Sequence, residues 1–99
     1  MFMFYTYILQ SLKNNRRYIG STGDIQKRLK EHNAGLSRYT KNRGPWELIY
    51  LEEKKTLNEA EMREKFFKTG DGRRALKVIL KDSLGDGVTV ARQILDLSV

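Results

Sequence analysis

Five side chains that could act on a phosphodiester occur between residues 7 and 64. Tyr7 and Tyr18 are phenols, and Arg28 is a permanent cation. His32 is a titratable ring four residues after Arg28, and Glu64 is a carboxylate. A guanidinium can bond two phosphate oxygens, a carboxylate can hold a metal ion, and phenols and imidazoles can exchange protons. These are the groups that chemistry at a phosphodiester requires.

The two tyrosines fall on a predicted β-hairpin. Residues 2–9 are rich in aromatic and β-branched side chains and predict a strand, and residues 16–20 predict its antiparallel partner after a turn at residues 13–15. The hairpin brings Tyr7 and Tyr18 onto adjacent strands. The alternative is that they are ordinary cross-strand packing partners, which is common for aromatic residues in sheets.

The cation and the imidazole fall on a predicted helix. Asp24 can cap the N-terminus of a helix that runs to about Asn33, and Gly35 suits its left-handed termination. Arg28 and His32, at positions i and i+4, share one face of it. The alternatives are a solvent-exposed Arg28 and a His32 that only complements the helix dipole. The predicted core stripe of this helix consists of Ile25, Leu29 and Leu36.

The remaining elements complete a predicted α/β fold. A basic loop, a third strand and a short third helix are expected at residues 36–45, 46–51 and 73–81. A second helix, capped by Thr56 or Asn58, should end near residue 69, where Gly70 and Gly72 break it. We expect a single domain at residues 1–82, with a central three-stranded antiparallel sheet flanked by helices on both sides. Residues 83–99 are expected to be a weakly helical or partly disordered extension. A purely helical domain is the alternative.

Glu64 occupies an unusual place on the second helix. Leu57, Ala60 and Phe67 define an apolar stripe, and Glu64 lies in the middle of it. A carboxylate on a core-facing stripe costs several kcal/mol unless it is paired, protonated or bound to a metal. One alternative to a metal ligand is a partly exposed Glu64 in a salt bridge with Lys68 at i+4.

The positive charge is concentrated near the tyrosines. The chain has 99 residues and a net charge of +7. Residues 45–99 hold equal numbers of basic and acidic side chains, so the whole excess lies in residues 1–44. This asymmetry predicts a polyanionic partner, with nucleic acid favoured over a membrane because no basic helix has a bulky apolar face. The alternative is a surface that only keeps the protein in solution.

Composition excludes several classes of protein. There is no cysteine, hence no disulfide framework and no cysteine-ligated zinc. The apolar run at residues 1–9 is too short to span a membrane and lacks the features of a secretory signal. A cytoplasmic, nucleoid-associated location is expected.

The order of these residues resembles that of the GIY-YIG nuclease family, in its small single-domain bacterial members. The resemblance covers about residues 3–80, although the leading glycine of the first motif is replaced by Tyr5. The matching segments are Tyr7-Ile8-Leu9-Gln10-Ser11, Tyr18-Ile19-Gly20-Ser21-Thr22, Arg28-Leu29-Lys30-Glu31-His32-Asn33 and Ala60-Glu61-Met62-Arg63-Glu64-Lys65.

The resemblance implies catalytic roles for Tyr7, Tyr18, Arg28, His32 and Glu64. One tyrosine would act as a general base on the attacking water, directly or through a hydrogen-bond network. Because the pKa of a phenol is about 10, nearby cations would have to assist it. The guanidinium would grip the scissile phosphate, and the histidine would bond a tyrosine or the phosphate. Glu64 would hold one divalent cation, Mg²⁺ or Mn²⁺.

The implied function is a metal-dependent endonuclease that hydrolyses DNA phosphodiester bonds in repair, recombination or mobile-element processing. RNA is the alternative substrate. The protein would act as a monomer or weak homodimer, with or without a larger repair partner. A non-catalytic nucleic-acid-binding module, or a subunit of a larger repair assembly, is the alternative function. Sequence-neutral phosphate contacts are expected from Lys27, Arg38, Lys41 and Arg43.

Overall fold

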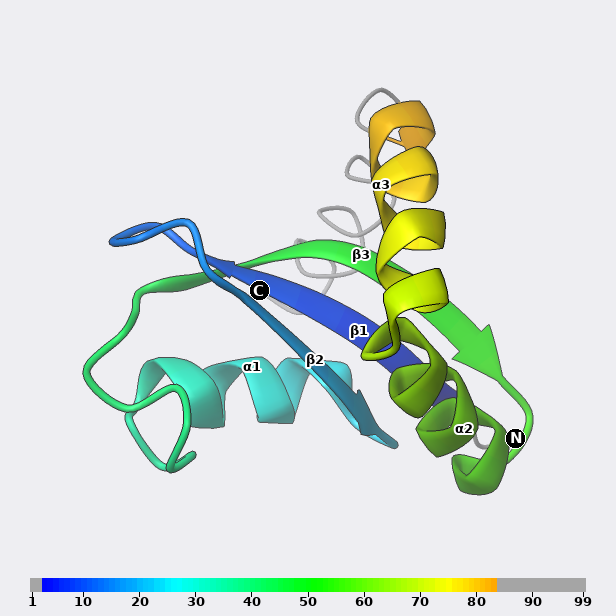
Figure 1. Ribbon diagram of the computed structural model, residues 1–99. Helices are drawn as coiled ribbons and strands as arrows, with labels where there is room; N and C mark the ends of the chain where they lie inside the picture. Colours follow the sequence, from blue (N-terminus) through cyan, green and yellow to red (C-terminus); the bar gives the residue numbers. More distant parts are fainter. Residues whose placement is uncertain (1–2, 84–99) are drawn as a thin grey trace.

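The aromatic and β-branched residues near the N-terminus form the central strand of a sheet. In the computed structural model, which describes residues 3–83, β1 (Phe4–Ser11) pairs antiparallel with β2 (Arg17–Thr22) and with β3 (Trp46–Lys54). The strand order is β2-β1-β3, so both neighbours of β1 are edge strands (Figure 1). The predicted three-stranded antiparallel α/β fold is confirmed.

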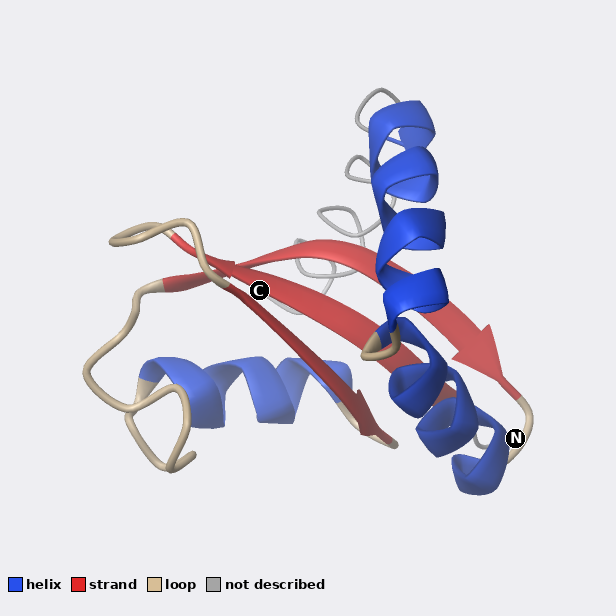
Figure 2. Ribbon diagram, viewed as in Figure 1, coloured by secondary structure: helices blue, strands red, loops and turns tan. Residues whose placement is uncertain are grey.

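Helices cover both faces of this sheet. One face carries α1 (Ile25–Asn33), and the other carries α2 (Leu57–Phe67) and α3 (Gly70–Ser83) (Figure 2). Asp24 caps α1 through the backbone N–H of the third residue beyond it, as predicted, and Thr56 caps α2 in the same way. None of the helices in residues 3–83 is long and apolar enough to cross a membrane.

The alternation of side chains along β1 divides the apolar residues between two small cores. Leu9 and Tyr7 belong to the core beneath α1, whereas Ile8 belongs to the core beneath α2 and α3. The first core is completed by Ile25, Trp46 and Leu48, and the second by Phe67 and Leu76. The two faces are therefore chemically independent except at the edges of the sheet.

Two predicted core residues are in fact exposed. Leu36 is 73% exposed, because the chain has left α1 and turned through Gly35, whose φ is +77°. Leu57 is 42% exposed, because it starts the first turn of α2, before Ala60, the first residue of that helix to be buried. Both errors extended a helical stripe beyond the part of the helix that covers the sheet.

The junction between α2 and α3 is tighter than predicted. The helix α2 ends at Phe67, and Gly70 already begins α3, so the glycines do not form a separate loop. A Cβ at Gly72 would collide with the backbone carbonyl of Phe66, so this junction requires a glycine there. The predicted extension at residues 83–99 lies, apart from Ser83, outside the described residues.

Candidate active site

A buried hydrogen-bonded chain links three elements on the α1 face of the sheet. Tyr7 lies on β1, and its hydroxyl is 2.9 Å from Nε2 of His32 on α1. The other ring nitrogen, Nδ1, is 2.8 Å from Oγ1 of Thr40 in the following loop. All three residues are only 1% exposed. Buried polar groups are costly unless they are hydrogen-bonded, and these groups satisfy one another.

A donor and an acceptor can be assigned to each hydrogen bond of this chain. Oγ1 of Thr40 donates to the backbone carbonyl of Ser37 at 3.4 Å. We assign the single proton of this hydroxyl to the Ser37 carbonyl, and in this assignment Oγ1 accepts the proton carried by Nδ1 of His32. Nε2 is then an acceptor, and the hydroxyl of Tyr7 donates to it. The imidazole is held in the tautomer that can take a proton from Tyr7.

Burial sets the protonation states of this pair. It raises the pKa of Tyr7 above the ordinary value, and although Arg28 opposes this shift, Tyr18 and Glu64 add to it. Burial, together with the charge of Arg28, lowers the pKa of His32 to about 4. The expected assistance of cations to the phenol is therefore outweighed. At neutral pH, Tyr7 keeps its proton and His32 is the free base, so His32 is not a cation that complements the helix dipole.

The two tyrosines meet diagonally across the strands. Tyr7 lies opposite Gly20 in the register and Tyr18 lies opposite Leu9, and the ring centroids of the tyrosines are 6.2 Å apart. The ring of Tyr18 is 4.7 Å from that of His32. A Cβ at Gly20 would lie 2.5 Å from the Tyr7 hydroxyl. The missing side chain of Gly20 leaves the space that this hydroxyl occupies.

Arg28 brings the permanent positive charge to the same cluster. Its side chain is 33% exposed, and its guanidinium lies 3.4 Å from Glu31. Burial alone would lower the pKa of Arg28, but interactions with the two phenols and with Glu31 outweigh that effect and raise it. Arg28 therefore stays charged beside Tyr7 and Tyr18, partly open to solvent, as a phosphate ligand requires.

Glu64 approaches the cluster from the opposite face of the sheet. Its Oε1 accepts a hydrogen bond from the hydroxyl of Ser21 at 2.8 Å, and its Oε2 lies 2.7 Å from the ammonium of Lys68. Ser21 follows Gly20 on the edge strand β2, so its side chain points to the α2 face. Glu64 therefore lies on the other face of the sheet from the Tyr7–His32 pair and bonds the edge strand β2.

The salt bridge that was the alternative for Glu64 is thus present, and its surroundings also suit a hard metal ion. The side chain of Glu64 is 23% exposed and that of Lys68 is 52% exposed. One carboxylate with a neighbouring hydroxyl is a donor set that Mg²⁺ accepts when water and phosphate oxygens complete its shell. No group of three or more acidic, histidine or cysteine side chains that could hold a metal occurs within residues 3–83.

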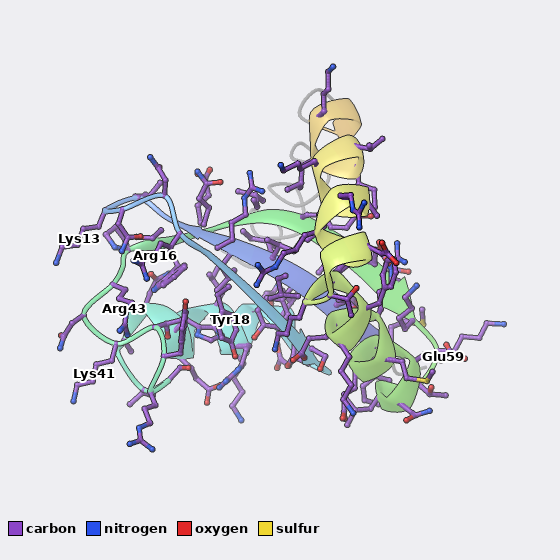
Figure 3. The ribbon with its side chains drawn as sticks, in the orientation of Figure 1. Lys13, Arg16, Tyr18, Lys41, Arg43 and Glu59 are labelled. Atoms are coloured by element: carbon purple, nitrogen blue, oxygen red, sulfur yellow. The ribbon has the colours of Figure 1, made fainter. Side chains whose placement is uncertain are left out.

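The predicted phosphate contacts do not form one group. Arg38, Lys41 and Arg43 line a shallow hollow of about 420 Å³ on the loop after α1, whereas Lys27 lines a separate hollow on α1 that also contains acidic side chains. Two cations of the β1–β2 turn, Lys13 and Arg16, gather near Lys41 and Arg43 at the same end of the molecule (Figure 3). Two hydrogen bonds join the turn to the loop. The backbone N–H of Leu12 donates to the carbonyl of Pro45, and the ammonium of Lys13 donates to the carbonyl of Asn42.

Sequence reasoning missed three members of the site. Ser21 lies in a segment that matched the family but was given no role of its own, and Tyr39 and Thr40 lie in the loop that was considered only for its charge. The ring of Tyr39 is 5.5 Å from that of Tyr18, and the Arg43 guanidinium lies 5.2 Å from the Tyr39 centroid. No periodicity in the sequence identifies Thr40, because its role depends on a loop that folds back over α1.

The site thus combines a tyrosine pair on a hairpin, an arginine and a histidine on the next helix, and a glutamate on a later helix. Comparisons with known proteins identify the family of the domain. The chain belongs to the GIY-YIG family, since the model of the GIY-YIG catalytic domain matches residues 3–75.

Its relatives within that family are UPF0213 proteins. One from Clostridium perfringens is 37% identical over 83 residues, which is 83% of this chain and 88% of that protein. One from Staphylococcus haemolyticus is 40% identical over 76 residues, which is 76% of this chain and 92% of that protein. The solution structure of a UPF0213 protein from Bacillus halodurans covers 84% of this chain and 97% of its own, with 27% identity and a TM-score of 0.48.

Proposed function

We propose that this protein is a divalent-metal-dependent endonuclease that hydrolyses phosphodiester bonds of DNA. The observation that carries the proposal is the pairing of Tyr7 with a neutral His32 beside Arg28, with Glu64 reaching the same place around β2. A binding module needs cations for phosphates, but it needs neither a buried proton acceptor nor a carboxylate beside them. RNA is the alternative substrate, since no described residue discriminates the sugar.

Each side chain has a defined part in the hydrolysis. The oxygen of a water molecule attacks phosphorus, the bond from phosphorus to the leaving oxygen breaks, and that oxygen leaves as a sugar hydroxyl after it takes a proton from solvent water. As the water loses its proton to the hydroxyl of Tyr7, that hydroxyl passes its own proton to Nε2 of His32. Arg28 binds the non-bridging oxygens, where negative charge grows in the transition state.

Glu64 and Ser21 would hold the divalent ion. Such an ion, Mg²⁺ or Mn²⁺, would supply charge stabilisation at the phosphate oxygens. The ammonium of Lys68 would have to leave Oε2 for this, and its exposed side chain is free to do so. One active site per chain makes a nick, so a double-strand break requires a dimer or two successive cuts.

A supercoiled plasmid incubated with the protein tests the proposal. We expect nicked circles with Mg²⁺ or Mn²⁺ and none with EDTA. Glu64→Gln should abolish nicking while it leaves DNA affinity nearly unchanged, because it removes the metal ligand and no phosphate-binding cation. Metal-dependent nicking by Glu64→Gln at the wild-type rate would remove Glu64 from the site.

The Glu64–Lys68 ion pair favours a second candidate, a non-catalytic nucleic-acid-binding module. In that case the carboxylate would only anchor α2 to β2 through Lys68 and Ser21. Wild-type protein would then bind DNA but would not nick it with either metal. Glu64→Gln would lower stability and change nothing else. A place in DNA repair or recombination, with or without a larger partner assembly, belongs to the first candidate.

A further inference from the structure

A second concentration of positive charge lies beside α3 and β2, and it begins next to Tyr39 of the loop at residues 36–45. A hollow of about 310 Å³ adjoins the active site and is lined by Arg17, Tyr18, Ile19, Tyr39, Lys68 and Arg73. A second hollow of about 260 Å³ is lined by Gln10, Arg17, Ile49, Lys77, Leu80 and Lys81. Arg17 lines both hollows, so they adjoin one another beside α3, and together they are called here the β2–α3 groove.

The groove is basic along its whole length. Arg73, Lys77 and Lys81 recur every four residues on α3, which places them on one face about 6 Å apart along the axis. Arg17 on β2 and Lys68 after α2 complete the set. Among the residues described, no carboxylate lines either hollow. The surface therefore carries up to five cations against no lining anion.

The net charge of residues 45–99 gives no sign of this groove. Residues 45–99 are neutral overall, and three of their carboxylates, Glu52, Glu64 and Asp71, form salt bridges within the described residues. Glu52 bonds Arg63 and Asp71 bonds Arg74, at 2.9 Å in each case. Neither Arg17 nor Arg73 forms a salt bridge with any residue of the described range. The fold thus separates charges that cancel in the sequence.

The groove is continuous with the active site. Tyr18 lines its first hollow and also lies 4.7 Å from His32. Lys68 lines the same hollow and bonds Glu64. A polynucleotide whose scissile phosphate lies at Arg28 would therefore bring its neighbouring phosphates to the mouth of the groove.

We propose that the β2–α3 groove binds the phosphate backbone of the nucleic acid on one side of the scissile bond, while the loop at residues 36–45 binds it on the other. This deepens the proposed function and rests on its nucleic-acid-binding part. Exposed cations along a groove, most of them outside any salt bridge of the described residues, are what sequence-neutral phosphate binding requires. The substrate is then held on both sides of the edge strand β2.

Salt-dependent binding of the full chain to a fluorescent DNA oligonucleotide tests the groove. The measurement is made in EDTA, so that no cleavage occurs. Arg73→Gln/Lys77→Gln removes two groove cations from α3, and Lys65→Gln/Arg74→Gln is a control that removes two exposed cations outside the groove, one from α2 and one from α3. We expect the groove variant to bind several-fold more weakly and to lower the slope of log Kd against log salt by about two units. Equal slopes for the two double variants would overturn the proposal. That result is expected if the groove binds an acidic protein and not nucleic acid.

A second measurement locates the contact and guards against misfolding. Arg17→Gln, on β2, should lower the slope by about one unit. Single phosphates near the mapped cut are replaced one at a time by neutral methylphosphonates. On one flank of the cut, such a replacement should weaken DNA binding by the wild type. The same replacement should not weaken binding by Arg73→Gln, because that variant has already lost the contact. If the losses of affinity from Arg73→Gln and from the methylphosphonate are additive at every phosphate, Arg73 contacts none of the phosphates tested. The two proposals can fail separately. If the wild type never nicks DNA but the groove variant binds more weakly than its control, the proposed hydrolysis is wrong and the proposed phosphate contact of the groove stands.

Discussion

The two faces of the sheet contribute to the site in opposite ways. On the α1 face, Tyr7, His32 and Thr40 are almost completely buried and are neutral at pH 7. On the α2 face, Glu64 and Lys68 are charged and partly exposed. Ionised groups are costly to bury, whereas neutral polar groups can be buried when they are fully hydrogen-bonded.

The difference separates two tasks. Proton transfer needs fixed distances and a fixed tautomer, and the packed α1 face supplies both. Binding of metal ions and phosphates needs charge that substrate can reach, and the exposed α2 face and the basic loop supply that. Gly20 on the edge strand β2 lies between the two groups of side chains. It leaves room for the Tyr7 hydroxyl, and the next residue, Ser21, bonds Glu64.

Among the variants compared below, Arg28→Ala should have the largest effect on turnover, because Arg28 is the one charged member of the α1-face cluster described above. We expect turnover to fall at least ~100-fold with a small change in DNA affinity, since its bonds to phosphate strengthen as charge develops. Single-turnover cleavage and binding titrations measure the two quantities. Lys30→Ala, an equal loss of charge on the same helix, should leave turnover unchanged. An Arg28→Ala variant that only binds more weakly would make Arg28 part of the binding surface.

Acid should destabilise the fold through His32. Its pKa of about 4 in the folded state lies below the ordinary 6.5, so between these values the unfolded chain binds the extra proton. Stability is unaffected above pH 6.5 and falls as the pH drops toward 4, by about 3 kcal/mol in total. Denaturant unfolding of wild type and His32→Gln at several pH values isolates this contribution. The same pH dependence in both proteins would show that His32 is not buried in its neutral form.

Gly20→Ala should disrupt the meeting point of the two faces. The added methyl group would push the Tyr7 hydroxyl away from His32, at a cost of about 1–3 kcal/mol for overpacking and with a loss of nicking. Gly70→Ala is the control, because a Cβ there meets nothing within 4 Å. Thermal unfolding and the plasmid assay compare the two. Wild-type activity in Gly20→Ala would mean that the Tyr7–His32 bond is not needed for catalysis.

Lys41→Ala should have the smallest effect. It removes one exposed cation of the basic loop, so DNA binding should weaken modestly and its salt dependence should fall by about one unit of slope. Turnover at saturating DNA should survive, because this contact is equal in the ground state and the transition state. A large loss of turnover in Lys41→Ala would place the loop in the chemistry and remove the division of tasks.

Local patterns were sufficient for the elements and for five side chains of the candidate site. Aromatic and β-branched runs give strands in any context, and Asp24 and Thr56 cap helices through their own next turn. The order of Tyr7, Tyr18 and Arg28 along the chain was enough to indicate the family, because its motifs lie in short segments. Helix ends were the least certain part, since Leu36 and Leu57 have core-like spacing but no sheet beside them.

Contacts between distant segments were decided only by the tertiary structure. Ser21 meets Glu64 across 43 residues, and Thr40 meets His32 through a loop that folds back over α1. The protonation states of Tyr7 and His32 depend on burial, which a spacing pattern does not measure. The β2–α3 groove arises because ion pairing removes the acidic side chains from one surface while Arg73 and Lys77 remain there. The sequence determines which groups are available, and packing determines which of them are neutral, which are charged and which can reach one substrate.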